Sequence, residues 1–425
     1  MREQHAEGLI ASPDYRWRWL ILTLLAVGVM ISFIDRTSIS AVLATPAFKK
    51  HFALSDLDRG WINSAFFWSY AVMQIPFGWL VDRRGVKWPY AICFAVWCVA
   101  TALTGLVDGF SELIAVRLLV GAAEAIVVPA SWRWIRTHFA ERQSGTAVGI
   151  YMLGTKIGPA LGTPIAASLI GITGWRTMFF IIGLAGLIWL LPWILLVSDD
   201  RHSPAAANPK TAAPPSFTVR QLLVSPLIWA TMIVVFCYNY FTFYCMTWMP
   251  AYLVEQRGLS LEKMGLYAFF SFAGIGFVAL FGGWAADRLI GRGGDPVFVR
   301  KAFTVAGFGL AASVVLGAYA PTLGQALFWN VASLSGLGLA TSNHLALCRL
   351  TLIPESGAGL VSGFQQVATA IAGIVAPILT AWLLKVGGDY TLPIDAIFVF
   401  LVIGALSTIF LLRPSWSLRG SEMGA

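Results

Sequence analysis

Long apolar stretches alternate with short polar segments along almost the whole chain. Each apolar stretch runs for about 20 residues, the length that an α-helix needs to cross the hydrocarbon core of a bilayer. The stretches are continuously apolar rather than alternating, which indicates helices and not a β-barrel. The pattern predicts an all-α membrane protein with twelve transmembrane helices, at residues 18–42, 61–81, 88–107, 111–133, 144–170, 177–197, 227–251, 264–285, 301–320, 323–347, 357–384 and 392–412.

Composition and charge agree with a membrane protein. Of the 425 residues, 58% are hydrophobic and 12% are charged, about half the charged fraction of a typical soluble protein. The net charge of +8 could suggest nucleic-acid binding, but 19 of the 29 Lys and Arg residues fall on the cytoplasmic side if both termini lie inside, and seven fall outside. This asymmetry follows the positive-inside rule. It predicts a multi-pass protein of the cytoplasmic (inner) membrane whose partners are lipids rather than nucleic acid.

A polar segment rich in Ala and Pro, at residues 199–220, interrupts the pattern. It predicts a six-helix N-terminal bundle at 1–197, a cytoplasmic linker at 198–226 and a six-helix C-terminal bundle at 227–425. The motif Gly-Trp-x-x-Asp-Arg occurs after the second predicted helix, at 78–83, and again after the eighth, at 283–288. Copies at equivalent places indicate an internal repeat, which is typical of transporters whose two bundles rock about a central site.

The first copy of this motif, which continues to Gly85, resembles the loop motif of the major facilitator superfamily. The resemblance covers nearly the whole chain and implies the major facilitator fold. Further motifs are similar to those of the anion:cation symporter branch, which includes bacterial sugar-acid and aromatic-acid permeases. They are Phe33-Ile34-Asp35-Arg36, Tyr70-x-x-x-Gln74-Ile75-Pro76-x-Gly78-Trp79, Arg117-x6-Glu124, Thr247-Trp248-Met249-Pro250-x-Tyr252-Leu253, and Gly363-x-x-Gln366 with Gly373 and Pro377.

Five charged residues lie well inside predicted membrane helices: Asp35, Arg36, Arg117, Glu124 and Lys156. Each costs at least about 2.5 kcal/mol in the bilayer unless it is paired or hydrated, so such groups usually line a hydrated cavity. The alternative is an ion-pair network that only holds helices together. Three cations against two acids leave one positive charge, which indicates an anionic solute. Snorkelling explains Lys156 poorly, because this residue is near the middle of its helix.

Glu124 and Asp35 are the candidates for binding protons. Arg117 and Glu124 are seven residues apart, about 10 Å along one helix face, so a tight direct pair is not expected. Dehydration favours the neutral acid and a nearby arginine favours the carboxylate, and the balance can bring the titration near neutral pH. The family resemblance implies that both acids couple proton movement and that Arg117 regulates Glu124.

Arg36 is the best candidate for binding a substrate carboxylate. Its planar fork can donate two hydrogen bonds to a carboxylate, and its charge does not titrate. Adjacent helical residues point about 100° apart, so a pair with Asp35 is not expected. In the resembling family, the matching first-helix arginine contacts the substrate anion.

Other polar side chains inside predicted helices could complete the binding site. Tyr70 and Gln74 lie one turn apart on the same face, whereas aromatic residues such as Tyr244 more often serve packing or interface roles. Phe33 stands where sugar-acid carriers often have tyrosine, and Gln366 where they often have asparagine; both departures argue against a polyhydroxylated substrate. The predicted substrate-binding set is Arg36, Tyr70, Gln74, Lys156, Asn239, Tyr244, Asn343 and Gln366.

The repeated loop motifs are expected to act differently from these residues. They lie at helix ends, where carboxylates can bind helix N-termini and arginines can bind C-terminal carbonyl groups. They are predicted to latch the outward-facing state without contacting substrate. The latch residues are Gly78, Asp82, Arg83, Asp287 and Arg288.

The leading hypothesis is a proton-coupled symporter that imports a small organic anion (a sugar acid, a dicarboxylate or an aromatic acid) by alternating access, and nothing demands more than a monomer. The alternative is an exchanger or exporter, because the fifth predicted helix carries a run that resembles the fifth-helix motif of superfamily antiporters, Gly154-x-x-x-Gly158-Pro159-x-x-Gly162. Close packing of small residues would also explain this run. An anion sensor is less favoured, since such sensors usually carry a soluble output domain. No phosphate loop, metal-ligand cluster or nucleophile–base pair occurs in the sequence, so neither enzyme chemistry nor a cofactor is expected.

Overall fold

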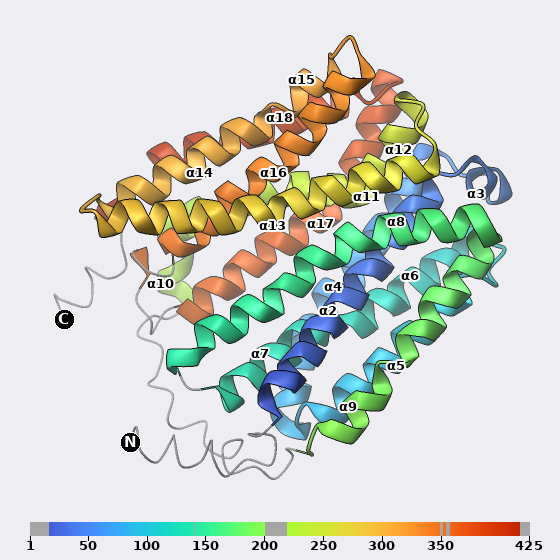
Figure 1. The fold of residues 1–425 in the computed structure, drawn as a ribbon, viewed down its shortest axis with the longest axis horizontal. Coiled ribbons are helices and arrows are strands. Elements are labelled where there is room, and N and C mark those ends of the chain that lie inside the picture. The colour runs from blue at the N-terminus through green and yellow to red at the C-terminus, as the bar shows by residue number, and fades with distance from the viewer. Residues whose placement is uncertain (1–16, 140, 200–218, 349–351, 354–357, 417–425) are drawn as a thin grey trace. The chain divides into compact units, whose positions relative to one another are not determined.

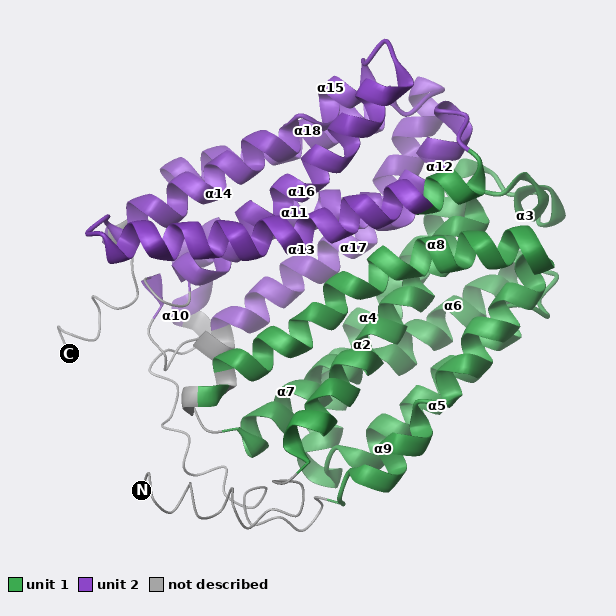
Figure 2. Ribbon diagram, viewed as in Figure 1, with its two compact units in different colours: residues 1–211, 260–265 green, residues 212–259, 266–425 purple. Residues whose placement is uncertain are grey.

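The computed structural model describes residues 17–139, 141–199, 219–348, 352–353 and 358–416. Throughout these ranges the regular secondary structure is helical, without a strand (Figure 1). The chain divides into two compact units, which Figure 2 shows in different colours: residues 1–211 with 260–265 form unit 1, and residues 212–259 with 266–425 form unit 2. Most of the predicted linker, residues 200–218, lies outside the described residues.

Unit 1 is a bundle in which α2 packs along α8, α4 packs along α6, and α5 contacts both α6 and α8. The start of α4 is fixed by its sequence, because the Ser55 hydroxyl accepts a hydrogen bond from the Asp58 N–H while the Asp58 carboxylate accepts one from the Ser55 N–H. Such a capping box satisfies the first backbone donors of a helix. The helices of unit 1 are α2 (Arg18–Leu43), α3 (Pro46–His51), α4 (Asp56–Arg84), α5 (Lys87–Leu103), α6 (Phe110–Glu124), α7 (Val127–His138), α8 (Glu141–Leu187) and α9 (Leu190–Leu196).

Unit 2 repeats part of this packing pattern, with α11 along α17 and α14 against α16 and α18. Thr322 and Asp295 cap the N-termini of α16 and α14 with their side-chain oxygens. Its elements are α10 (Val219–Leu223), α11 (Pro226–Thr247), α12 (Met249–Ala251), the π-helix η3 (Tyr252–Gln256), α13 (Leu261–Gly291), α14 (Pro296–Ala312), α15 (Val314–Ala318), α16 (Leu323–Leu347), α17 (Ala358–Gly387), α18 (Thr391–Phe410) and the 3₁₀-helix η6 (Pro414–Trp416).

All twelve predicted spans fall on helices of the described chain. The fourth is divided between α6 and α7, and the ninth between α14 and α15. The fifth and sixth share one continuous stretch in which Gly174, with φ of +81°, interrupts α8 between them. Eight helical stretches of the described residues meet the length and composition needed to cross a membrane; the four further predicted spans are α4, α5, α16 and the second span within residues 145–196.

A small ionic cluster joins α3, the α5–α6 turn and α8 in unit 1. Asp108 accepts a hydrogen bond from Arg176, and its Oδ1 lies 3.1 Å from the His51 ring nitrogen Nε2. The Arg176 guanidinium, with a contribution from His51, holds the pKa of this exposed carboxyl below its usual range. Asp108 therefore stays ionised and paired except in acid, and the cluster fixes where α8 passes the end of α5.

Candidate substrate and proton site

Four charged side chains are buried together in unit 1, two from α2 and two from α6. Asp35 and Arg36 come from the second half of α2, and Arg117 and Glu124 come from one face of α6. Their exposed fractions are 3%, 9%, 6% and 0%. The Arg36 Nε donates a hydrogen bond of 2.8 Å to Glu124 Oε2. Two acids and two arginines make the cluster neutral when all four are ionised, which lowers the cost of burying them.

Three aromatic rings surround the Arg36 guanidinium. Its Cζ lies 4.6 Å from the ring centre of Phe33, 4.8 Å from that of Phe66 and 4.7 Å from that of Tyr70. The Arg117 guanidinium lies 5.1 Å from the same Phe66 ring. Ring faces attract a cation without neutralising it, so this arrangement holds Arg36 in place and leaves part of its fork able to bind another anion.

Several polar atoms of the cluster lack a hydrogen bond within the described part of the chain. They are both carboxylate oxygens of Asp35, Oε1 of Glu124 and Nε of Arg117. Buried polar atoms are normally paired, and the exceptions concentrate where a protein binds a ligand, an ion or a proton. The cluster therefore keeps unused hydrogen-bonding capacity and is not a completed ion-pair lock.

The pairing within the cluster differs from the sequence expectation in one respect. As the spacing indicates, no ion pair joins Arg117 to Glu124, or Asp35 to Arg36, among the described residues. Glu124 instead binds Arg36, a contact between two helices that was not predicted. Arg36 and Glu124 are 88 residues apart in the chain, and only the packing of the unit 1 helices brings them together.

The glycines of the fifth predicted helix form the surface of α8 that packs against α2. A Cβ atom on Gly158 would lie 2.6 Å from the Cβ of Phe33 and 2.7 Å from the carbonyl oxygen of Met30, and Gly154 and Gly162 approach Ala26 and Thr37 even more closely. Close packing therefore accounts for this glycine run. It also positions Phe33, and with it the nearby residues Asp35 and Arg36 of α2.

Valine at Gly158 is expected to push α2 away from α8 and destabilise the folded protein by about 1–3 kcal/mol. The predicted result is a lower melting temperature in detergent and less monodisperse protein on size-exclusion chromatography. Gly171→Val is the matched control, because Gly171 lies on the same helix and has no atom within 4 Å of the added Cβ. Equal melting temperatures for the two variants would contradict the packing role.

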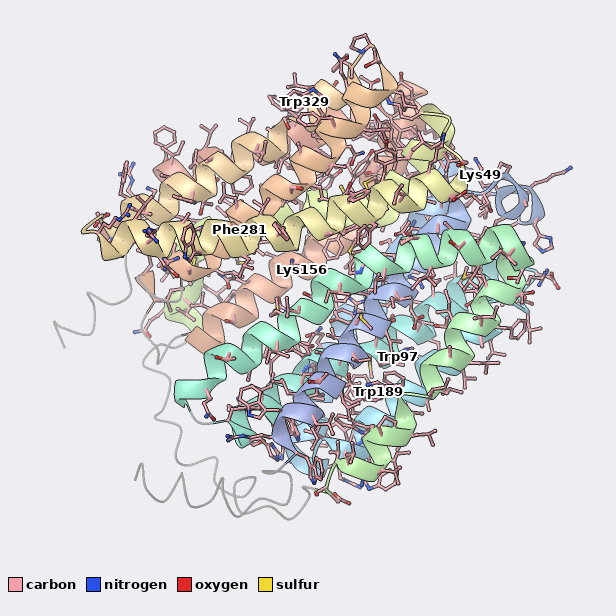
Figure 3. The ribbon with its side chains drawn as sticks, in the orientation of Figure 1. Lys49, Trp97, Lys156, Trp189, Phe281 and Trp329 are labelled. Carbon is pink, nitrogen blue, oxygen red and sulfur yellow. The ribbon has the colours of Figure 1, made fainter. Side chains whose placement is uncertain are left out.

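Lys156 lies on α8, near the middle of the fifth predicted span (Figure 3). It follows Gly154 by two residues and precedes Gly158 by two, so it points away from the face that contacts α2. The side chain is partly exposed, and no hydrogen bond or ion pair to it occurs among the described residues. The structure therefore does not place Lys156 in the Asp35–Arg36–Arg117–Glu124 cluster, and its role in substrate binding stays a prediction.

The predicted residues of unit 2 do not form one cluster. Asn239 on α11 donates hydrogen bonds to the Val235 carbonyl oxygen at 2.9 Å and to Thr369 Oγ1 on α17 at 3.2 Å. Gln366 is exposed on α17, one residue after the buried Gln365. The link from Asn239 to Thr369 joins α11 to the helix that carries Gln366.

Tyr244 and Asn343 lie elsewhere in unit 2. Tyr244 lines a narrow pocket enclosed by α11, η3, α15, α16 and α18, together with Tyr252 and Asn330. Asn343 is fully buried on α16, where its Nδ2 donates to the Leu339 carbonyl oxygen at 3.1 Å. In unit 1, Gln74 is half-buried one turn from Tyr70.

The two copies of the Gly-Trp-x-x-Asp-Arg motif adopt similar local structures. In each copy the arginine lies over the tryptophan four residues earlier: the distance from Cζ to the ring centre is 4.3 Å for Arg83 over Trp79 and 5.5 Å for Arg288 over Trp284. The aspartate of each copy binds an arginine of its own unit. Asp82 pairs with Arg133 on α7 at 3.3 Å, and Asp287 pairs with Arg300 on α14 at 2.7 Å.

Arg133 and Arg300 are thus the partners that the sequence did not identify. Arg133 also donates to the carbonyl oxygen of Val81, at the end of α4. Gly78 has open space around it, with no atom within 4 Å of an added Cβ. The pairs tie neighbouring helices within each unit, and a latch between units stays a prediction.

Comparison with known proteins extends these observations. The Major Facilitator Superfamily profile matches residues 25–377. A probable sulfoacetate transporter of Cupriavidus necator is 30% identical over 411 residues, which cover 93% of this chain and 94% of the relative. The D-galactonate transporter of Escherichia coli is 27% identical over 94% of this chain and 97% of its own length. The hexuronate transporter of Bacillus subtilis is 27% identical over 93% and 94%.

Among solved structures, a bacterial homologue of the human lysosomal transporter Spinster, inward-facing and unoccupied, superposes with a TM-score of 0.79 at 19% identity. The match covers 96% of this chain and 99% of that one. At this level of identity the likeness shows the fold alone.

The helical fold and the relatives define a multi-pass membrane transporter rather than an enzyme. The chain belongs to the Major Facilitator Superfamily. This confirms the family resemblance of the sequence motifs and the predicted fold of two six-helix bundles. The relatives are named as transporters of organic acids, as the resemblance to the anion:cation symporter branch implies.

Proposed function

We propose that the protein is a symporter that imports a small organic anion together with protons across a bacterial inner membrane, by alternating access of its two units. The observation that supports this most strongly is the buried cluster of Asp35, Arg36, Arg117 and Glu124, in which an arginine able to bind an anion already binds a carboxylate able to take up a proton. In this proposal both termini lie in the cytoplasm and the protein acts as a monomer.

Glu124 and an incoming anion compete for the same guanidinium. While Glu124 is ionised, its Oε2 accepts the Arg36 Nε–H and its charge opposes a second carboxylate. A proton on Glu124 removes that charge and frees Arg36 for a charge-assisted pair with the substrate. By linkage, a bound anion must then favour the protonated form of Glu124 by the same factor, which couples the two fluxes.

Asp35 supplies a second proton site in the proposed cycle. Its carboxylate interacts electrostatically with Glu124 and Arg117, and neither of its oxygens has a hydrogen bond within the described residues. If both acids carry protons, a monoanion enters with one net positive charge. The membrane potential then drives uptake by about 2.3 kcal/mol per 100 mV.

The substrate that we propose is a small acid with a carboxylate or sulfonate head group. The named substrates of the relatives are of this kind: sulfoacetate, galactonate and hexuronates. Of the three rings around Arg36, those of Phe33, Phe66 and Tyr70, only the last carries a hydroxyl group. Unit 1 is therefore suited to hold the acid head group of the solute. For the remaining predicted residues contact with the solute stays a prediction; they are Gln74, Lys156, Asn239, Tyr244, Asn343 and Gln366.

An obligate exchanger is less well supported. The glycine run that motivated it is explained by packing of α8 against α2, whereas the unpaired oxygens of Asp35 and Glu124 favour proton binding.

Transport by purified protein in liposomes distinguishes symport from exchange, with sulfoacetate, D-galactonate, D-glucuronate, D-glucarate and benzoate as solutes. We expect at least one acid to accumulate under an inward proton gradient alone, and a protonophore to abolish the accumulation. Uptake that occurs only with acid preloaded inside would show exchange instead.

A further inference from the structure

Three buried hydroxyl groups converge in unit 1 from three different helices: Tyr90 on α5, Ser131 on α7 and Tyr151 on α8. Their exposed fractions are 0%, 0% and 2%. Each tyrosine hydroxyl lies within interaction range of the Ser131 hydroxyl. None of the three oxygens has a hydrogen bond of ordinary geometry in the described part of the chain. A buried hydroxyl usually has one, and a polar pocket of this kind is suited to bridging water.

The three hydroxyl groups lie about two helical turns from Glu124 and Asp35. Ser131 follows Glu124 by seven residues, and Gly28, which faces the Tyr90 hydroxyl, precedes Asp35 by seven. A Cβ atom on Gly28 would lie 2.7 Å from the Tyr90 Oη. Seven residues are two helical turns, or about 10 Å. On both helices the hydroxyl groups therefore lie about 10 Å from the acids, toward the end of the unit where α2 begins.

The same spacing continues along α6 and α7. Arg117, Glu124, Ser131 and His138 recur every seven residues, and the two residues between the helices, Ala125 and Ile126, keep helical dihedral angles. Residues seven apart lie on nearly the same helix face. A polar line thus runs from the charged cluster to His138 at the end of α7.

Aromatic packing fixes the Tyr90 end of this line. The Tyr90 ring lies 4.8 Å from that of Trp193 and 5.4 Å from that of Trp189, and Phe94 stacks on Trp189 at 4.2 Å. The ring cannot swing away, so its hydroxyl stays directed at Gly28 and Ser131.

We propose that Tyr90, Ser131 and Tyr151 form a hydroxyl relay, bridged by water, that carries the proton between Glu124 and the aqueous phase at the α2-start end of unit 1. This inference rests on the proposed proton coupling, in which that phase is the cytoplasm. In each step an oxygen accepts a proton from the donor behind it while its own O–H bond breaks and passes a proton ahead. Glu124 is left as the carboxylate, water takes the proton at the exit, and no relay oxygen keeps a charge.

The test combines three substitutions that each remove an oxygen and little else: Tyr90→Phe, Ser131→Ala and Tyr151→Phe. In liposomes, with the panel acid that wild-type protein accumulates fastest, we expect the triple variant to lower the initial rate of proton-driven uptake by about 10-fold or more, since a lost proton-transfer group commonly has an effect of this size or greater. Counterflow of the same acid should stay near the wild-type rate, because exchange of substrate needs no net proton release.

Tyr240→Phe is the matched control, since Tyr240 in unit 2 is equally buried and its hydroxyl also lacks an ordinary hydrogen bond among the described residues. It should change neither rate. Unchanged proton-driven uptake in the triple variant would overturn the relay, and so would an equal fall in uptake and counterflow, which would show that the hydroxyl groups only support the fold. If wild-type protein showed no proton-driven uptake of any acid in the panel, that result would reject the proposed function itself, and the relay with it.

Discussion

Replacing Arg36 by alanine is expected to reduce uptake of the organic anion by at least about 30-fold, because truncating one partner of a buried, hydrogen-bonded charge pair costs about 2–5 kcal/mol. In the proposed function the guanidinium binds the head group of the substrate, and the rings of Phe33, Phe66 and Tyr70 hold it in place. Initial uptake rates and a thermal-shift titration with the transported acid measure the loss. Near-normal affinity in Arg36→Ala would show that the anion binds elsewhere.

A loss of transport could also follow from leaving Glu124 charged, buried and unpaired, since Arg36 is its hydrogen-bond partner. The double variant Arg36→Ala/Glu124→Gln separates the two causes, because it removes that orphaned charge. We expect the double variant to recover the melting temperature of wild-type protein but not anion binding. Arg36→Lys keeps the charge without the planar fork, so it should bind the anion more weakly than wild type and better than Arg36→Ala. Recovery of binding in the double variant would refute direct contact between Arg36 and the substrate.

Replacing Glu124 by glutamine is expected to abolish accumulation driven by a proton gradient while leaving counterflow intact. Glutamine resembles the protonated acid in shape and charge, so the variant would be held in the form that binds substrate and could not release a proton. Uptake against a concentration gradient and exchange at equal pH measure the two activities separately. Accumulation that kept its dependence on external pH would remove Glu124 from the coupling role.

Glu112→Gln is the control on the same helix. Glu112 is exposed at the start of α6, where its carboxylate accepts hydrogen bonds from the backbone N–H groups of Asp108 and Gly109. Glutamine keeps an acceptor oxygen there, so this variant should accumulate the acid as wild type does. An equal loss of coupling in both variants would indicate a general effect of removing a negative charge from α6.

The helices could be predicted because lipid as a solvent leaves a strong pattern: about 20 apolar residues in succession, with Lys and Arg gathered between them. The helix ends were less predictable. The single helix α8 contains the fifth predicted span and the first part of the sixth, with Gly174 as the interruption between them. Helix α4 begins at Asp56, five residues before its predicted start, because Ser55 and Asp58 cap it.

The chemistry of the site could be predicted in kind but not in its pairing. A charge inside a membrane helix is conspicuous, so Asp35, Arg36, Arg117 and Glu124 could be selected from the sequence. Which arginine binds Glu124 depends on how α2 and α6 are rotated about their axes, and the glycine contacts of α8 with α2 fix part of that rotation. The hydroxyl groups of Tyr90, Ser131 and Tyr151 were not recognised, because single Tyr and Ser residues are common in membrane helices and their convergence is visible only in three dimensions.

Simultaneous measurement of acid uptake and proton uptake by the same liposomes tests directly whether the anion and protons cross the membrane together. A radiolabelled acid from the panel would report the anion, and a pH-sensitive dye trapped inside would report protons. We expect wild-type protein to take up both together, with at least one proton for each anion, and Glu124→Gln to move neither under a proton gradient alone. Anion uptake without any acidification of the lumen, at any external pH, would contradict the proposed function.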